Sequence, residues 1–439
     1  MGEAKVRRFF FASAIATLLG STVSQADELT ISRSDYAEKL HGFWLGQCIA
    51  NWTGIITEMD KIGGEGDRGV FYTRKDWGTT VQSKWWGGRT RTETIDWVRR
   101  GPDEIWGADD DTDIEYMYQY LLSKHETARL TGEQIRDGWI THIHDENNSP
   151  IKNARGQGEN FLWVSNQRAH DLMLDGVVPP ATSDPANNEF HEMIDAQLTT
   201  EIFGLYAPGR PDVGLEIANL PIRTTASGEA ALASQFYVIM HSLAVSVDPT
   251  ASRKSQIQWM AAQARAHMPD ESTTAKMYDF VKSRYDAGVP WEQARDDVYT
   301  RYQVEQQDGY DVAPRNPVAS GINFAASIVS LLFGEGDYQE TVKIAVLAGW
   351  DSDNPAATWG GLLGFMIGRQ GVEEAFGQEF SNRYYIHRTR TGFPVPEGVD
   401  NFPDMAAAGV KIVDRVVVDE IGGEILDDQW VIPLTDQPQ

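Results

Sequence analysis

Apolar residues recur every three to four positions along most of this chain, a spacing that places them on one face of an α-helix. The clearest example is the segment 112–124, whose apolar side chains are Ile114, Met117, Tyr118, Leu121 and Leu122. The same period predicts helices over residues 36–54, 230–245, 255–267, 273–287, 290–302, 319–333, 338–349 and 354–369. Alternation with a period of two, which is typical of strands, is scarce, so we predict an all-α fold.

The tail departs from this pattern. Residues 411–419 and 424–432, joined at Ile421-Gly422-Gly423, predict a β-hairpin. Segments 60–106, 146–192 and 381–404 are rich in Gly, Pro, Asn and Trp, which predicts long loops, and long loops in a compact domain are often functional. No repeat or low-complexity linker divides the chain, so we predict one helical domain over residues 27–405 and a C-terminal hairpin extension over residues 406–439.

Two predicted helices carry a strip of small residues. In the segment 36–54 the strip consists of Gly42, Gly46, Ala50 and Gly54, spaced by four. In the segment 354–369 it consists of Ala356, Ala357, Gly360, Gly361, Gly364 and Gly368. Small residues let another helix approach closely, so we expect each helix to lie tightly against a neighbour and the start of the second to be buried.

Two short acidic clusters carry the strongest chemical signal. The first is Asp109-Asp110-Asp111-Thr112-Asp113 and the second is Asp351-Ser352-Asp353-Asn354. Carboxylates packed this densely repel one another unless a cation lies between them, and oxygen ligands suit hard cations. No arginine or lysine occurs between Lys343 and Arg369 to neutralise the second cluster. The clusters therefore predict the two halves of one metal site.

Simpler interpretations explain only part of these clusters. Asn354 can cap the helix that follows it, and an acidic helix N-terminus is favoured by the helix dipole. A calcium-binding EF-hand is excluded, because Ile114 and Ala356 stand where that loop requires glycine. The fragment Gly64-Glu65-Gly66-Asp67-Arg68-Gly69 matches a dinucleotide-binding fingerprint by letter, but no strand precedes it and no helix follows. His142 and His144 are two apart and would face different sides of a helix.

Composition limits the possible partners. The 439 residues carry a formal net charge of −26, which argues against nucleic acids and anionic membranes as partners. Residues 1–26 are typical of a secretory signal: Lys5, Arg7 and Arg8 precede a short apolar run, and Ser24-Gln25-Ala26 offers a cleavage site. We therefore predict an exported protein, periplasmic or secreted, that leaves the membrane after signal cleavage. Cys48 is the one cysteine, so no intramolecular disulfide can form, and we expect it to be a buried apolar residue.

The order of these motifs resembles the ADP-ribosylglycohydrolase family, relatives of the dinitrogenase-reductase-activating glycohydrolase. That family has a glycine-rich first helix followed by an acidic residue, matched here by Gly42-Phe43-Trp44-Leu45-Gly46 and by Glu58. Its T-D-D-T motif corresponds to Asp109-Asp110-Asp111-Thr112, and its G-D-x-D-T motif corresponds to Trp350-Asp351-Ser352-Asp353-Asn354. The resemblance covers roughly residues 35–375.

The resemblance implies an orthogonal bundle of α-helices that holds two magnesium ions, with manganese or calcium as alternatives. The implied ligands are Asp109, Asp110, Asp111, Asp351, Asp353 and Asn354, and the implied catalytic residues are Glu58 and Asp111. Trp350, Ser352 and Asn323 are the candidates for contact with substrate, and Asn323 could equally be a core amide. The implied activity is hydrolysis of a glycosidic bond at a ribose-like furanoside, with a small-molecule or glycan substrate.

Several positions depart from the family pattern. Asp109 and Asn354 replace threonines, Asn51 replaces an aspartate, and Trp350 replaces a small residue. Thr224-Thr225 stands where many members have a threonine-histidine pair. ADP-ribosyl groups, another furanoside, and binding of a sugar or nucleotide without turnover therefore remain alternatives. The sequence gives no prediction of the oligomeric state.

Overall fold

A computed structural model of the chain describes Met1 and residues 28–82, 92–312 and 316–434. The predicted signal segment, residues 1–26, lies outside the described residues apart from Met1, so it stays a prediction. In the described part of the chain, no helix is both long enough and apolar enough to cross a membrane.

Helices dominate the described residues, which confirms the all-α prediction. They are α1 (Arg33–Gly54), α2 (Asp110–Lys124), α3 (Gly132–His142), α4 (Val164–Leu174), α5 (Ile202–Tyr206), α6 (Pro211–Thr225), α7 (Gly228–Leu243), α8 (Arg253–His267), α9 (Thr273–Asp286), α10 (Trp291–Val298), α11 (Ser320–Gly334), α12 (Tyr338–Ala348), α13 (Asp353–Phe376) and α14 (Phe402–Arg415). Two short sheets have the strand orders β1-β6-β5 and β2-β3-β4. The strands are β1 (Glu28–Ser32), β2 (Trp106–Gly107), β3 (Arg383–Tyr385), β4 (Val399–Asn401), β5 (Glu424–Leu426) and β6 (Gln429–Pro433).

Every helix predicted from periodicity is present, with small differences at its ends. The prediction over 290–302 divides into α10 and a π-helical stretch, η4 (Tyr299–Val304). The predicted loop over 146–192 is wrong in part, because it contains α4. That helix is rich in Ser, Asn, Gln and His, and its burial against α3 and α6 outweighs this weak helical composition.

The first strand of the predicted tail hairpin is wrong. Residues 411–419 belong to α14 and to the π-helical stretch η7 (Val416–Ile421), although three consecutive valines favour a strand. Met405, Val410 and Val413 recur with helical spacing and are buried, and α14 packs along α1, so tertiary contacts override local propensity. The hairpin forms later, between β5 and β6, and β6 also pairs with β1. Residue 406, the predicted domain boundary, lies within α14.

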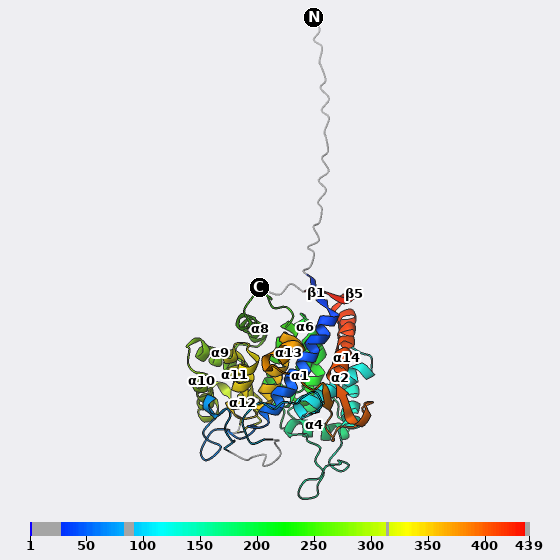
Figure 1. Ribbon diagram of the computed structural model, residues 1–439. Helices are drawn as coiled ribbons and strands as arrows, with labels where there is room; N and C mark the ends of the chain where they lie inside the picture. Colours follow the sequence, from blue (N-terminus) through cyan, green and yellow to red (C-terminus); the bar gives the residue numbers. More distant parts are fainter. Residues whose placement is uncertain (2–27, 83–91, 313–315, 435–439) are drawn as a thin grey trace.

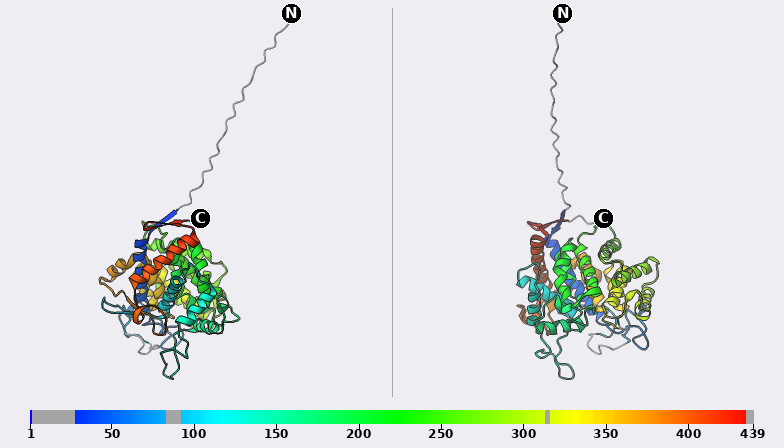
Figure 2. Two further views of the ribbon diagram at one scale, coloured as in Figure 1. Left: turned by 90° about the vertical axis from the view of Figure 1, so that its right-hand side faces the viewer. Right: turned by 180° about the vertical axis from the view of Figure 1, so that it is seen from behind.

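The two ends of the described chain meet in one sheet, far from the long loops. In Figure 1 the sheet β1-β6-β5 lies at the top, and α1 descends from β1 toward the loops at the bottom, beside α14 and α13. The two further views in Figure 2 show the same separation, with the loop before α4 at the opposite end from the sheet. The C-terminal end of α1 therefore lies at the end of the molecule that is rich in loops.

The closest helix packing joins α1 to α13. The strips of small residues predicted that each helix lies close to a neighbour, and the structure shows that the two helices are each other's neighbour. A Cβ atom added to Gly46 would lie 2.4 Å from the carbonyl oxygen of Gly360, and one added to Gly42 would lie 2.3 Å from that of Gly364. At the end of α1, a Cβ atom on Gly54 would lie 2.3 Å from Asp353 Cα. No side chain larger than hydrogen fits at these positions, so the backbones of the two helices are in direct contact.

The apolar core surrounds this helix pair. Cys48 is fully buried in α1, as expected, and burial raises the pKa of its thiol, so it is an apolar packing residue. Tyr338, from α12, reaches the same interface and donates a hydrogen bond of 2.7 Å to the Gly46 carbonyl. The core is therefore closely packed around α1, the helix that ends just before Glu58.

We predict that Gly46→Ala lowers the free energy of unfolding by about 1–3 kcal/mol, because the added methyl group forces α1 and α13 apart. Chemical denaturation measures this change. Gly101→Ala is the control, since its added Cβ atom would approach nothing closer than Glu104 Oε2 at 3.8 Å, and it should change stability by less than about 0.5 kcal/mol. Equal effects of the two substitutions would contradict the close packing.

Candidate active site

Glu58 lies in the turn that follows α1. Its backbone N–H donates to the Gly54 carbonyl at 3.1 Å, which continues the last turn of the helix. The next residue, Met59, has a φ of +59°, and its N–H donates to the Trp350 carbonyl at 2.8 Å. The helix end therefore points Glu58 toward the loop that carries the second acidic cluster.

The second cluster occupies the turn between α12 and α13. Gly349 and Trp350 both have positive φ, of +101° and +56°, which reverses the chain sharply. The turn is fixed by backbone contacts with the segment after α1, since Trp350 N–H donates to the Lys61 carbonyl at 2.7 Å. Asp351 N–H donates to the side-chain oxygen of Asn323 at 3.1 Å.

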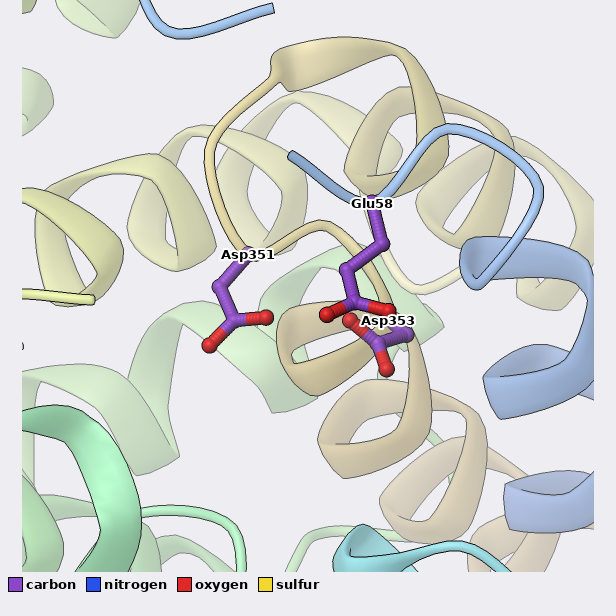
Figure 3. Close-up of side chains that lie close together, drawn as sticks. All are labelled: Glu58, Asp351 and Asp353. Carbon is purple, nitrogen blue, oxygen red and sulfur yellow. The ribbon is translucent and has the colours of Figure 1, made fainter. Parts of the chain in front are cut away.

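Glu58, Asp351 and Asp353 come together into one group, which Figure 3 shows in close-up. One carboxylate oxygen from each lies within 4.8 Å of the others. Glu58 comes from the turn after α1, while the two aspartates come from the turn before α13 and from its first residue. The approach of Gly54 to Asp353 is what makes this convergence possible.

Asp109, Asp110 and Asp111 form a second group at the start of α2. Again one oxygen from each lies within 4.8 Å of the others. Two amides hold Asp111: Asn51 Nδ2 donates to its Oδ2 at 3.1 Å, and Asn354 Nδ2 donates to its Oδ1 at 3.4 Å. Asn51 is on α1 and Asn354 on α13, so the same helix pair positions both acidic groups.

Electrostatic repulsion acts throughout these groups. Burial, together with the neighbouring negative charges, raises the pKa of Glu58, Asp110, Asp111 and Asp353 well above the usual range. Burial raises the pKa of Asp351 to about 7, with Asp110 adding to the rise. Such an arrangement is costly for carboxylates alone and favours a cation among them.

The residues present fit divalent metal ions. All six carboxylates supply hard oxygen donors, and Asp353 Oδ1 and Asn354 Oδ1 are buried without a hydrogen-bond partner in the described part of the chain. Asp109, Asp110, Asp111, Asp351 and Asp353 are thus placed where ligands are required, and Asn354 has a free oxygen beside them. Glu58, which we predicted as a catalytic residue, is also placed as a possible ligand.

The three predicted substrate contacts lie elsewhere. Trp350 is fully buried, its indole N–H donates to Gln303 Oε1 at 2.9 Å, and its ring packs on Phe71. Ser352 is also fully buried, and its hydroxyl donates to the Gly54 carbonyl. Asn323 is a core amide that receives Asp351 N–H. None of the three side chains lines the cavity; Trp350 and Ser352 are packed in the core beside the second acidic cluster, and Asn323 holds the Asp351 N–H.

Both acidic groups open onto one cavity of about 980 Å³. Its remaining walls include side chains that sequence reasoning did not assign: Arg68, Lys152, Glu159, Phe161, Asp195, His387 and Arg388. Trp52 and Trp163 also line it. Most of these residues come from long loops, whose composition predicted function but no particular contact.

A buried ion pair lies behind the first cluster. Arg390 Nε lies 3.1 Å from Asp113 Oδ2, and both side chains are almost fully buried. Burial raises the pKa of Asp113 to about 6, and the Arg390 charge opposes that rise. Sequence reasoning counted Asp113 as part of the acidic cluster, but its partner, 277 positions further on, had no local signal.

The chain matches the family model for ADP-ribosylglycohydrolase over residues 32–395. It belongs to the ADP-ribosylglycohydrolase family. A solved structure named "ADP-ribosylglycohydrolase-related protein complex" is similar, with 14% identity, coverage of 87% of this chain and 99% of that chain, and a TM-score of 0.45. No curated protein sequence matches.

Membership confirms the resemblance found in the sequence. Proteins of the ADP-ribosylglycohydrolase family are metal-dependent glycohydrolases, and the matched region contains both acidic groups and Glu58. The described part of the matched region is mostly helical, which agrees with the predicted fold. Membership in a glycohydrolase family implies a small-molecule substrate.

We predict that, without divalent cations, stability falls as pH rises from about 4 to about 7. The ordinary pKa of aspartate is about 4 and that of folded Asp351 is about 7, so in this interval the folded state keeps a proton that the unfolded state has lost. Thermal unfolding in EDTA across this range measures the fall. Magnesium or manganese at 100 times its Kd should restore about 2.7 kcal/mol near neutral pH.

The control for this experiment is Asp337→Asn, which changes an exposed aspartate at the start of α12. It should keep the full response to cations, whereas Asp353→Asn should lose most of it. A melting temperature that does not respond to magnesium, manganese or calcium in the unmodified protein would contradict the metal site.

Proposed function

We propose that this protein is a magnesium-dependent hydrolase that cleaves the glycosidic bond of a ribose-like furanoside, either an ADP-ribosyl group or a related sugar. The observation that carries the proposal is that two groups of three carboxylates face one cavity large enough for a substrate of several rings. Family membership supports glycoside hydrolysis, and the set of oxygen ligands supports magnesium, with manganese or calcium as substitutes.

The cations would bind the ribose hydroxyls and lower the pKa of a water molecule between the two acidic groups. The chain itself supplies the acceptor for that water's proton, and Asp111 is our assignment because Asn51 and Asn354 orient both of its oxygens. Water adds its hydroxyl to the anomeric carbon as the bond to the leaving group breaks, and the proton taken by Asp111 passes to the leaving group.

Glu58 has a different task in this proposal. It lies in a turn, between Gly54 and the positive-φ residue Met59, and it is less buried than Asp351 or Asp353. We assign it to the edge of the site, where it contacts the sugar beside the scissile bond. Its oxygen lies within 4.8 Å of Asp351 and Asp353, so its position depends on the charge held there.

We also propose that the protein acts outside the cytoplasm. The support is the sequence pattern of residues 1–26: basic residues, a short apolar run, and small residues before Asp27. The single cysteine gives such a protein no disulfide to form after export. Cell fractionation and N-terminal sequencing test this part, with a mature chain that begins at Asp27 as the expected result.

We predict that, with magnesium, the purified protein releases sugar from at least one member of a panel. The panel contains ADP-ribosyl-arginine, 4-nitrophenyl β-D-ribofuranoside and 4-nitrophenyl α-L-arabinofuranoside. Glu58→Gln and Asp111→Asn should each lower kcat by about 100-fold or more, because each removes a carboxylate from the reacting end of the cavity.

The matched controls are Glu133→Gln in the exposed first turn of α3 and Asp337→Asn at the start of α12. Both should retain the activity of the unmodified protein. Absence of release from every glycoside, with bound metal verified by elemental analysis, would refute the hydrolase. Full activity in Glu58→Gln and Asp111→Asn would refute the assigned roles while leaving the hydrolase standing.

A further inference from the structure

Asp195 is a buried carboxylate in the cavity wall that belongs to neither acidic group. It lies in the short 3-10 turn Ile194–Ala196 and is only 3% exposed. Among the described residues that line the cavity, Glu159 and Asp195 are the two carboxylates outside the acidic groups, and Glu159 is partly exposed. Burying this carboxylate costs free energy, because it loses contact with water. Asp195 is nevertheless not one of the expected metal ligands.

Two hydrogen bonds hold Asp195 at the start of α4. The Ser165 hydroxyl donates to Oδ2 at 2.6 Å, and Asn166 N–H donates to Oδ1 at 3.1 Å. No lysine, arginine or histidine forms an ion pair with it within the described ranges. The backbone N–H groups of Ser165 and Asp195 also stabilise the charged form of this carboxylate. Asp195 still lines the cavity, so a ligand donor can approach it there. The negative charge of Asp195 also reaches Asp351, whose pKa it raises.

The chain segment just before Ser165 and Asn166 places aromatic side chains in the cavity wall. Phe161 and Trp163 both line it, with ring centroids 6.0 Å apart and nearly perpendicular planes, and Trp163 is 40% exposed. Phe161 and Val164 have positive φ, of +53° and +34°, conformations that such side chains rarely adopt. Strain of this kind is kept where the surroundings enforce it and is frequent at ligand sites.

Arg390 is what enforces this conformation. Its Nη1 donates to the Asn160 carbonyl at 2.7 Å and its Nη2 to the Phe161 carbonyl at 3.3 Å. The same guanidinium pairs with Asp113 on α2, two residues beyond Asp111. The aromatic segment is therefore braced against the helix that starts with the first acidic group, so its distance from the reacting end of the cavity is fixed.

We propose that Asp195, Phe161 and Trp163 form a recognition subsite for a flat ring that carries hydrogen-bond donors. The aromatic side chains would contact the face of the ring, and Asp195 would accept hydrogen bonds from its edge. This subsite rests on the proposed function, in which it holds a ring of the substrate other than the sugar that is cleaved. A sugar ring has this chemistry through its C–H face and hydroxyls, and a purine has it through its π-face and amino group. The diphosphate group of ADP-ribose has no hydrogen-bond donor near neutral pH, and its negative charge is repelled by Asp195.

A purely structural role for Asp195 is the alternative that must be tested. Its bond to Asn166 N–H lies in the first turn of α4, so it could serve as a helix cap supplied from another part of the chain. Asp337 supplies the comparison, since its side chain accepts Glu340 N–H at 2.8 Å at the start of α12 and does not line the cavity. The side chains of both aspartates accept a hydrogen bond from a backbone N–H, but of the two only Asp195 lines the cavity.

The experiment measures binding by titration calorimetry with magnesium present, using an uncharged arabinofuranosyl disaccharide, adenosine and ADP-ribose as probes. Asp195→Asn keeps the size of the side chain and an oxygen for Asn166 N–H, but it removes the charge and one acceptor. We expect Kd to rise about tenfold for the probe that fills the subsite, as the loss of one good hydrogen bond implies. Trp163→Ala should weaken the same probe by a similar factor, and Asp337→Asn should change no Kd.

The identity of the affected probe distinguishes a sugar from a purine. Unchanged Kd values for all probes in Asp195→Asn, with a lowered melting temperature, would show a helix cap only and overturn the subsite. Failure of every probe to bind the unmodified protein would overturn it as well. If Asp195→Asn does not fold, Trp163→Ala decides, because its side chain is partly exposed. Binding is read without turnover, so a failed hydrolase assay leaves this result interpretable.

Discussion

The direct backbone contact between α1 and α13 is the constraint on which the rest of this structure depends. Three glycines of α1, Gly42, Gly46 and Gly54, meet two glycines of α13 and the first residue of that helix. Helices that touch in this way leave no room for side chains, so their relative position is fixed by carbonyl and Cα atoms. Side-chain rotamers, which adapt easily, have little influence on this geometry.

The acidic site is the point at which that contact ends. Gly54 is the last residue of α1 and Asp353 is the first of α13, so the helices leave their interface with one carboxylate on each side. Asn51 and Asn354 extend from the same two helices to Asp111 on α2. Carboxylates that repel one another are thus held together by packing elsewhere, which leaves their charge available for a cation.

Local patterns in the sequence were sufficient for most of this arrangement. The spacing of Gly42, Gly46 and Gly54 predicted that another helix lies close to α1, and the density of aspartates predicted two halves of one site. What the sequence could not reveal were the contacts between remote loops. Trp350 stood beside two ligands and suggested a stacking surface, but its positive φ turns the side chain into the core, against Phe71. Asp195 carried no motif, because its partners are a serine and a backbone amide thirty positions away.

The pairing of β1 with β6 has a consequence for how such a protein can change. This strand pair anchors the start of α1, and the contact of Gly54 with Asp353 anchors its end, so the helix can neither slide nor rotate by one residue. A one-residue slip would turn each glycine by about 100° away from α13. The loop before α4 lies at the opposite end of the molecule from this strand pair and takes no part in the contact between α1 and α13. Changes in the loop before α4 can therefore reshape the cavity wall without moving the two helices that hold the acidic groups.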